Sequence, residues 1–360
     1  MQHSIHQEKY DYIIIGQGIC GTFLSYYLLQ KGCKVIVIDT SIHNSASKVA
    51  SGVINPVTGR RIVRTWIIET LMPFAFDAYT AIGNLLEIDI IQQKNIIDFH
   101  TTPQMKLAFE ERLLQEQEYL HLPNNESNFQ EYFHSFFGAG IIAPCYWIDM
   151  VKLLSTWRTY LLNRNILLET NFDYAALSVK ANEVIYESFS ADKILFTDGC
   201  NGTINPYFHQ LPFAKNKGEA LIVSIPNLPK NQLYKFGLSL VHWKDDLWWV
   251  GSTYEWKYED VLPTEAFKKK VIDLLHTWLK LPFTIMDHFA AERPANIERR
   301  PFVGLHPTHK NVGILNGMGT KGCSLAPYFA EQLTNHLLYQ KEIDPLANVQ
   351  RFSKILTRTF

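Results

Sequence analysis

The sequence is poor in cysteine and has no long apolar run, and each absence excludes a class of protein. Its five cysteines are odd in number, scattered and without a CxxC pair, so neither a disulfide framework nor a cysteine zinc site is indicated. No stretch approaches about 18 residues without a glycine or polar break, which argues against a membrane-spanning helix. The N-terminal "MQHSIHQEKY" lacks the basic and apolar regions of a signal peptide. We therefore expect reduced thiols and a cytoplasmic protein without a membrane span.

An excess of charge of one sign is also missing. The 34 basic and 35 acidic side chains leave a net charge of −1 over 360 residues, which gives no global signal for nucleic acid or an anionic membrane. The 13 histidines and the acidic residues show no metal-ligand spacing such as HExxH, so we predict no metal site. Neither a GxSxG nucleophile motif nor a phosphate-binding P-loop is present.

The strongest motif in the chain is a glycine-rich turn near the N-terminus. "DYIIIGQGICG" indicates a strand followed by Gly16, Gly18 and Gly21, and "CKVIVIDT" indicates a second strand ending at Asp39. In a βαβ unit, these glycines permit a tight turn, the approach of a pyrophosphate and close packing of helix on strand. Asp39 is expected to accept hydrogen bonds from an adenosine ribose, and its charge disfavours NADP. The motif predicts a dinucleotide site without separating NAD from FAD.

The chain beyond this unit departs from the short βα rhythm of NAD enzymes. Residues 43–61 are rich in serine, alanine and glycine, which suits close approach to a phosphate or a planar ring, an ordinary surface loop being the alternative. The segment "NGMGTKGCSLAP", 316–327, indicates a glycine-rich loop entering a helix whose first turn contains Pro327. The N–H groups at such a helix start can hold an anion. The two glycine-rich loops hold either two ligands or two ends of one long ligand.

The segments between these loops predict a mixture of helices and strands. The expected elements are a helix over 65–82, a helix beginning near Asp149, a strand and glycine turn over 191–202, and strands of a second sheet at 218–225 and 247–254.

Taken in order, the motifs resemble the D-amino-acid oxidase superfamily of FAD enzymes, which includes glycine oxidase, sarcosine oxidases and D-amino-acid dehydrogenases. The segments that carry the resemblance are "IIIGQGICG", "SKVASGVINP", "ILFTDGCNG", "GEALIVSI", "VGSTYEW", "ERPANIERRPFVG" and "NGMGTKGCSLAP". "VGSTYEW" and the last loop are most similar to the C-terminal FAD domain of the bifunctional enzyme that modifies the tRNA wobble uridine side chain.

The resemblance implies an α/β fold in two parts. A Rossmann-like FAD-binding domain of the glutathione-reductase type would comprise residues 1–80, 143–213 and 293–360. A substrate-binding domain with a mixed or antiparallel sheet would comprise 81–142 and 214–292.

The resemblance also implies a single extended FAD that both glycine-rich loops contact. The implied FAD-binding residues are Gly16, Gly18, Gly21, Asp39, Ser47, Lys48, Ser51, Gly52, Gly199, Gly317, Met318, Gly319, Thr320, Lys321 and Gly322. The N–H groups of the last loop would stabilise negative charge at N1/C2=O of the reduced flavin, and Lys321 would add a full positive charge, a solvent-facing lysine being the alternative. "PANI", 294–297, stands where sarcosine oxidases attach flavin through a cysteine, so FAD is expected to be non-covalent.

The implied activity is oxidation of the C–N bond of a small amine or amino acid, with hydride transfer to flavin N5. Arg293 matches the superfamily's substrate-carboxylate arginine by its Arg-Pro context, the alternative being a structural ion pair with Glu292 or Glu298. Trp249 stands where sarcosine oxidases carry an oxygen-activating lysine, so oxidase and dehydrogenase activity both stay open.

Two other functions remain open at this point. One is FAD-dependent processing of the tRNA wobble-uridine side chain, for which Arg60, Arg61 and Arg64 form a local basic cluster. The other is a non-catalytic FAD-binding redox sensor. The substrate, the electron acceptor and the oligomeric state do not follow from the sequence.

Overall fold

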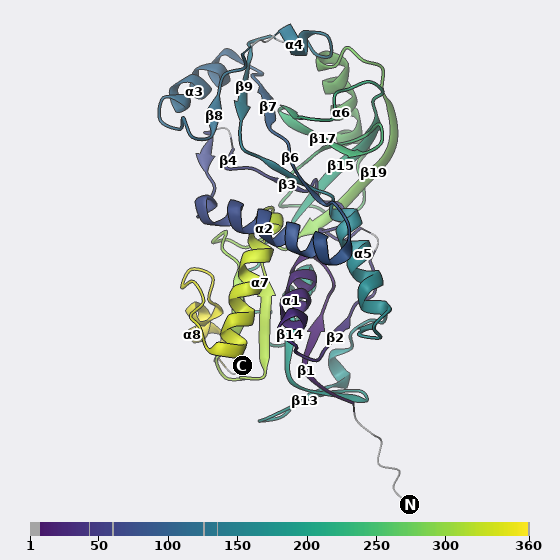
Figure 1. Ribbon diagram of the computed structural model, residues 1–360, viewed down its shortest axis with the longest axis vertical. Coiled ribbons are helices and arrows are strands. Elements are labelled where there is room, and N and C mark those ends of the chain that lie inside the picture. Colours follow the sequence, from purple (N-terminus) through teal and green to yellow (C-terminus); the bar gives the residue numbers. More distant parts are fainter. Residues whose placement is uncertain (1–7, 43, 60, 125–126, 135, 359–360) are drawn as a thin grey trace, which may run out of the picture.

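The computed structural model describes residues 8–42, 44–59, 61–124, 127–134 and 136–358. Figure 1 shows two large sheets, one at each end of the molecule, with the long helix α2 (Ile68–Leu86) crossing between them. Each large sheet has eight strands within the described residues. This confirms the predicted α/β fold with a Rossmann-like sheet and a second sheet.

The first sheet has the strand order β11-β2-β1-β14-β13-β12, and β21 pairs with β14 and with β20. Strands β11, β2, β1, β14 and β21 run parallel, so their carboxyl ends lie along one edge. Its strands are β1 (Glu8–Ile15), β2 (Val35–Ile38), β11 (Leu167–Leu168), β12 (Leu177–Val179), β13 (Val184–Tyr186), β14 (Phe189–Phe196), β20 (Phe302–Leu305) and β21 (Val312–Asn316). All four residues of β2 are buried, as expected for a parallel strand covered on both faces.

Helices α1 (Ile19–Gln30), α5 (Met150–Leu162) and α7 (Gly322–Tyr339) pack beside this sheet. Asp149 caps α5, as predicted, by accepting a 2.9 Å hydrogen bond from the Lys152 N–H. Helix α7 begins five residues before Pro327, so the prediction of a proline in the first turn was wrong. A proline there leaves the carbonyl four residues earlier without its helical donor, and the Tyr79 hydroxyl donates to that oxygen, on Cys323, at 2.9 Å.

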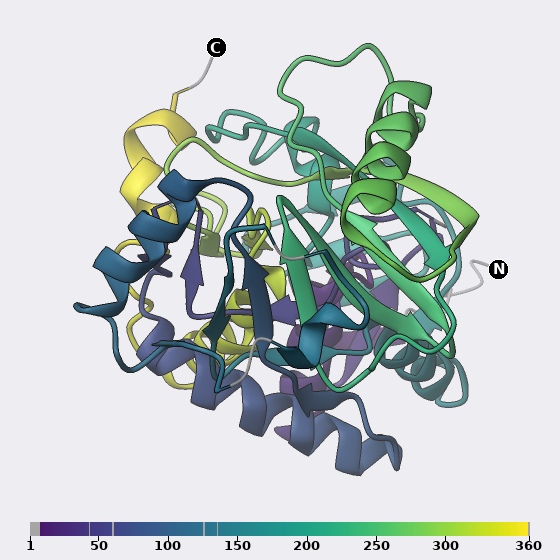
Figure 2. The same cartoon turned by 90° about the horizontal axis from the view of Figure 1, so that it is seen from above.

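The second sheet has the order β19-β15-β18-β17-β16-β7-β9-β8, and only β16 and β7 pair in parallel, so it is the predicted mixed sheet. Its strands are β7 (Ile96–Phe99), β8 (Leu120–His121), β9 (Ala139–Ile142), β15 (Asn216–Ser224), β16 (Leu233–Phe236), β17 (Leu238–Lys244), β18 (Leu247–Gly251) and β19 (Thr284–Arg293). Helices α3 (Pro103–Leu113) and α6 (Glu265–Trp278) lie at opposite ends of this sheet (Figure 2).

The two faces of β15 serve different purposes. Leu221 and Val223 belong to a core cluster shared with α6, whereas Ala220 and Ile222 belong to the large cluster that continues into α1, α2 and α7. Because side chains alternate along a strand, this alternation fixes which face of β15 looks towards the first sheet.

The remaining elements are a small sheet, a two-stranded pair and several short helices. A small sheet joins β3 (Val53–Ile54), β10 (Tyr146–Ile148) and β6 (Ile91–Gln93), and β4 (Val57–Thr58) pairs with β5 (Val63–Arg64). The short elements are α4 (Ser127–Gln130), α8 (Ser353–Leu356), η1 (Tyr174–Ala176), η2 (Gly199–Thr203) and η3 (Val349–Phe352). No helix in the described part of the chain is long and apolar enough to cross a membrane. The division into domains stays a prediction, and its boundary at residue 80 falls inside α2.

Candidate active site

One cavity of about 530 Å³ runs from the carboxyl edge of the first sheet to the inner face of the second sheet. It joins segments that are far apart in the sequence. The predicted site residues that line it are Gly16, Gly18, Asp39, Ser47, Lys48, Ser51, Gly199, Arg293, Met318, Gly319, Thr320 and Gly322. Gly21, Gly52, Gly317 and Lys321 are not among its lining residues. The cavity therefore lies where ligands bind in open α/β sheets, outside the carboxyl ends of the strands.

The N-terminal glycines explain how β1 turns directly into α1. Gly16 has a φ of +96°, and a Cβ there would lie 2.7 Å from the Thr197 carbonyl oxygen. A Cβ on Gly21 would overlap the Gly16 carbonyl oxygen, so Gly21 serves helix-to-strand packing and does not line the cavity. Gly18 is the N-cap of α1 and provides no side-chain cap, so beyond the Ile19 N–H, which donates to Ser47, this helix start keeps N–H groups for an anionic group.

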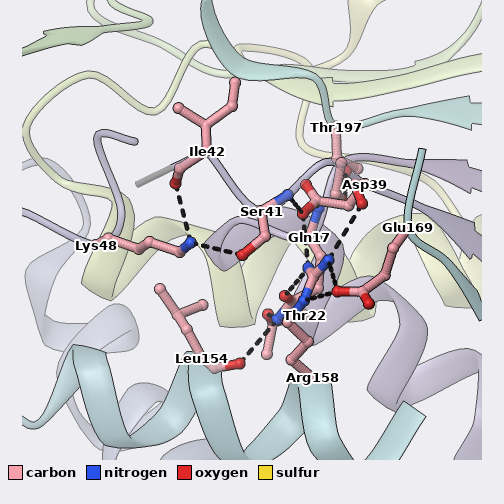
Figure 3. Close-up of polar contacts among 11 residues, drawn as sticks. Gln17, Thr22, Asp39, Ser41, Ile42, Lys48, Leu154, Arg158, Glu169 and Thr197 are labelled. Carbon is pink, nitrogen blue, oxygen red and sulfur yellow. Dashed lines mark hydrogen bonds and ion pairs between the residues drawn. The ribbon is translucent and has the colours of Figure 1, made fainter. Parts of the chain in front are cut away.

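Asp39, at the end of β2, is held by contacts that the sequence analysis missed (Figure 3). Its Oδ2 accepts from the Gln17 N–H at 2.8 Å, and its Oδ1 accepts from the Ser41 N–H at 2.7 Å and from Arg158 Nη1 at 2.7 Å. Arg158, on α5, also donates to Glu169 at 2.7 Å. A carboxylate offers about four lone-pair sites, so Asp39 keeps acceptor capacity for a ligand hydroxyl. No local motif signals Arg158, because its partner lies 119 residues away.

The segment after β2, which includes Ser47 and Gly52, contacts both α1 and β10. Ser47 Oγ accepts from the Ile19 N–H at 3.0 Å. Lys48 Nζ donates to Ser41 Oγ at 3.1 Å and to the Ile42 carbonyl at 2.9 Å (Figure 3). Gly52 has a φ of +75°, and a Cβ there would overlap the Ile148 carbonyl, so this glycine permits pairing with β10.

The end of β14 adds a half-buried acid, Asp198, that sequence reasoning missed. Gly199 has a φ of +57° and lines the cavity beside Asp198. Burial raises the pKa of the Asp198 carboxyl to about 6. The hydrogen bonds that this carboxylate accepts from Asn205, Tyr174 and Asn316 lower its pKa but do not offset the effect of burial. The Asn316 amide also donates to the Gly199 carbonyl at 2.8 Å, so it joins the ends of β14 and β21.

The loop before α7 divides into lining and supporting residues. Gly317 has a φ of +76°, and a Cβ there would lie 2.9 Å from the Phe302 ring. A glycine at this position therefore permits close packing of the loop against Phe302. The Gly319 N–H donates to the Pro294 carbonyl at 3.1 Å and is therefore already used within the protein. Lys321 Nζ donates to Asn55 Oδ1 at 2.9 Å, and burial lowers the pKa of Lys321 to about 8.

Arg293 ends β19 and lines the cavity on the side of the second sheet. Its Nη1 donates to Asn216 Oδ1 at 2.8 Å and to the Thr253 carbonyl at 3.0 Å, its Nη2 donates to Ser252 Oγ at 2.7 Å, and its guanidinium lies 4.7 Å from the centre of the Tyr254 ring. Burial lowers the pKa of Arg293 from its usual value. It makes no ion pair with any described residue.

The ion pairs proposed as the alternative for Arg293 are formed by other cations. Glu292 pairs with Lys215 at 3.0 Å and accepts from the Tyr258 hydroxyl, and Glu298 pairs with Arg351 at 3.1 Å. The interpretation of Arg293 as a structural ion pair was therefore wrong.

A family model described as "FAD dependent oxidoreductase" (DAO) matches residues 11–336. The chain belongs to this family. The match spans both glycine-rich loops and both large sheets, which are the parts that enclose the cavity.

Solved structures show the same fold as this FAD-dependent oxidoreductase. Glycine oxidase from Bacillus cereus aligns with a TM-score of 0.79 and 16% identity, over 97% of this chain and 99% of that one. Iminodiacetate oxidase from Chelativorans sp. aligns with a TM-score of 0.75 and 17% identity, over 93% of this chain and 97% of that one. L-α-glycerophosphate oxidase from Mycoplasma pneumoniae, a structure with FAD bound, aligns with a TM-score of 0.73 and 16% identity, over 94% of this chain and 97% of that one.

The residues of this oxidoreductase fit an extended FAD. The open start of α1 suits the pyrophosphate, and the acceptor capacity of Asp39 at the end of β2 suits the ribose. The far part of the cavity lies between Met318 on the last loop and Ala220 on the second sheet, where small and apolar side chains suit a planar ring. Both glycine-rich loops thus line one continuous cavity, which fits one long ligand better than two.

Proposed function

We propose that this FAD-dependent oxidoreductase oxidises the C–N bond of a small amine or amino acid, and that Arg293 binds an anionic group of the substrate. Bound FAD supplies the acceptor for a hydride from the carbon next to the amine. The protein's own part is to hold the substrate against the flavin in the cavity between the two sheets.

The observation that carries the proposal is the guanidinium of Arg293. It lines the cavity and makes no ion pair with the described residues. Burying a charge without a counter-ion is costly, so a carboxylate arriving in the cavity would offset a cost that the folded protein already bears. The three hydrogen bonds made by Nη1 and Nη2 leave two of the five N–H donors, which suffices for a carboxylate.

The similar proteins support the same chemical class. Glycine oxidase and iminodiacetate oxidase are named for substrates that contain both an amine and a carboxylate. L-α-Glycerophosphate oxidase is named for a phosphate ester, so an anion at Arg293 does not by itself specify an amino acid. The test must therefore include amines with and without a carboxylate.

The basic cluster that motivated a tRNA substrate receives little support. Arg64 donates to Glu116 at 2.6 Å, to Glu69 at 2.5 Å and to Glu118 at 3.2 Å, so its charge is balanced within the protein. Arg60 lies outside the described residues. A redox sensor without turnover remains the alternative that reduction of the flavin by substrate would eliminate.

The proposal predicts that Arg293→Ala slows flavin reduction by an amino acid far more than reduction by the corresponding amine. Loss of a desolvated, charge-assisted pair costs about 2–5 kcal/mol, or roughly 30- to 5,000-fold in kcat/KM. Anaerobic mixing of the holoenzyme with glycine and methylamine, or with N-methylglycine and dimethylamine, followed by flavin absorbance, measures both rates. Arg293→Lys should recover only part of the rate, because an ammonium lacks the planar fork.

The exposed Arg299 provides a matched control, since Arg299→Ala removes an arginine six residues away without touching the cavity. Equal slowing of amino acid and amine by Arg293→Ala would show that the arginine has no carboxylate role. A flavin that no amine, amino acid or N-substituted glycine reduces would contradict the proposed oxidation itself.

A further inference from the structure

A second cavity, of about 280 Å³, lies between the start of α5 and the end of β17. The indoles of Trp147 and Trp243 form part of its lining, and Lys152 and Lys244 bring two ammonium groups to it. Trp147 is buried, Trp243 is partly buried, and both lysines are exposed. None of the residues that the sequence predicted for FAD or substrate lines this cavity, so it is a separate feature of the fold.

The second cavity shares a wall with the main cavity. Met150, the first residue of α5, lines both of them. The centre of the Trp243 ring lies 6.4 Å from that of Phe289, which lines the main cavity. Phe289 pairs with Ala220, in the part of the main cavity that suits the flavin ring. A ligand in the second cavity would therefore lie one layer of side chains away from the flavin.

Positive charge predominates around the second cavity. Lys152 and Lys244 form no ion pair with a described residue. Lys94 is only 6% exposed, its Nζ lies 4.5 Å from the centre of the Trp147 ring, and it too has no acidic partner in the described part of the chain. Burial lowers the pKa of Lys94 to about 8, so most of it is charged at pH 7. Asp149 is the acid among the described lining residues, and its Oδ1 already accepts from the Lys152 N–H. These charges favour a ligand that accepts hydrogen bonds and gains electrons.

We propose that the second cavity binds the ring of a quinone, which reoxidises the flavin. The two indoles suit a planar ring, and the ammonium groups of Lys152 and Lys244 can donate to its carbonyl oxygens. Because a layer of side chains prevents direct contact with the flavin, the acceptor must take up electrons and protons separately, as quinones do. The reduced flavin gives up two electrons and one proton. The quinone takes the two electrons and, with one further proton from solvent, becomes the hydroquinone.

Binding is tested with duroquinone, whose ring carbons are fully substituted and do not add thiols. Equilibrium dialysis against the oxidised holoenzyme gives a dissociation constant without electron transfer. Trp243→Ala should raise this constant about three- to tenfold, the contribution of one aromatic pair, and Trp243→Phe should retain most of the affinity. Val151→Trp should also weaken binding, because Val151 is exposed at the start of α5 and a larger side chain there would fill the cavity. Trp256→Ala and Leu162→Trp are the controls, since both positions are exposed and lie outside both cavity linings.

Electron transfer is tested by mixing dithionite-reduced holoenzyme, freed of excess dithionite, with duroquinone under anaerobic conditions. The absorbance of oxidised flavin should return at a rate that saturates with duroquinone, with half-saturation near the dissociation constant. Trp243→Ala and Val151→Trp should raise the half-saturation concentration, and the two controls should not.

Absence of binding, affinity that neither Trp243→Ala nor Val151→Trp weakens, or binding without reoxidation of the flavin would each overturn the quinone site. This inference goes beyond the proposed function, because it concerns the electron acceptor and not the substrate. Dithionite replaces the substrate in the experiment, so a failure of the proposed amine oxidation would leave its result unchanged.

Discussion

At the residue scale, two cations of the site lack an acidic partner among the described residues. Arg293 is held by neutral oxygens of Asn216, Ser252 and Thr253, and Lys321 is held by the amide oxygen of Asn55. Desolvation disfavours the charged form of both side chains and lowers both pKa values. Such cations are poised to gain from an anion, so each charge is expected to act on a bound ligand.

Lys321 is expected to raise the flavin reduction potential while it is protonated. Thr320 and Gly322 line the cavity on either side of it, so its charge lies close to the lining although the side chain binds Asn55. A hydrogen bond or contact to a charged group is worth about 1.5–3 kcal/mol, or roughly 30–60 mV for a two-electron couple. Lys321→Met should therefore lower the potential of the bound flavin at pH 7, measured by anaerobic titration against a reference dye.

The pH dependence of the flavin reduction potential tests the effect of the Lys321 charge independently. Because burial lowers the pKa of Lys321 to about 8, the ammonium is present below pH 8 and its effect fades as the pH rises above it. The gap in potential between wild type and Lys321→Met should thus shrink from pH 7 to pH 9, whereas Lys321→Arg should keep a gap from Lys321→Met at both pH values. An unchanged potential in Lys321→Met would show that the backbone N–H groups stabilise the reduced flavin alone.

At the scale of elements, the ribose end of the cavity depends on a helix that is remote in sequence. Arg158 on α5 joins Asp39 at the end of β2 to Glu169, just past β11 (Figure 3). The side chains of Arg158 and Asp39 are 12% and 21% exposed, so this ion pair is better shielded than a surface pair. The carboxylate that would receive the ribose is thus oriented by three separate elements of the first sheet's layer.

Arg158→Ala should weaken FAD binding without abolishing the fold. Losing the charge-assisted hydrogen bond to Asp39 is expected to cost about 1–2 kcal/mol, or roughly 5- to 30-fold in the FAD dissociation constant. Titration of apoprotein with FAD, followed by quenching of flavin fluorescence, measures the change. Arg164→Ala is the control, since Arg164 follows the same helix and stacks on Tyr160 at 3.6 Å. The same loss in both variants would assign the effect to the stability of α5 and not to Asp39.

At the scale of the whole molecule, the cavity exists because two sheets and the helices between them share one core. The largest core cluster includes residues of α1, α2 and α7 together with residues of both sheets. The two ends of an extended ligand would contact segments from the first and the last part of the chain, Gly16 to Gly18 and Met318 to Thr320. Ligand binding and the packing of the two sheets are therefore expected to be coupled.

FAD is expected to leave the protein on denaturation. Cys20, Cys200 and Cys323 line the cavity, but burial raises the pKa of each thiol to about 12, so none is a reactive thiolate at neutral pH. Acid precipitation should leave yellow, fluorescent FAD in the supernatant, and the intact mass of the chain should match its sequence. Flavin that remains with the precipitate, with a matching gain in mass, would contradict non-covalent binding.

The order of residues alone was enough to predict the architecture and the ribose-to-pyrophosphate half of the cavity. Gly16, Gly18, Gly21 and Asp39 belong to one consecutive βαβ unit, so their spacing specifies their geometry locally, and the order of the later motifs specified the family and its two sheets. The sequence alone did not distinguish the glycines that line the cavity from those that permit close packing. Gly52, for example, is needed because a Cβ there would overlap the Ile148 carbonyl of β10, which is remote in sequence.

In the rest of the site, packing between remote elements determines which side chains act together. Arg158 meets Asp39 across 119 positions of sequence, Lys321 meets Asn55 across 266, and the Tyr254 ring lies 4.7 Å from the Arg293 guanidinium although the two residues belong to different strands or loops. No periodicity or motif encodes these contacts, because each depends on how separate elements pack and pair. The charge, pKa and exposure that give these residues their expected roles are properties of those contacts, and so they arise only in the folded chain.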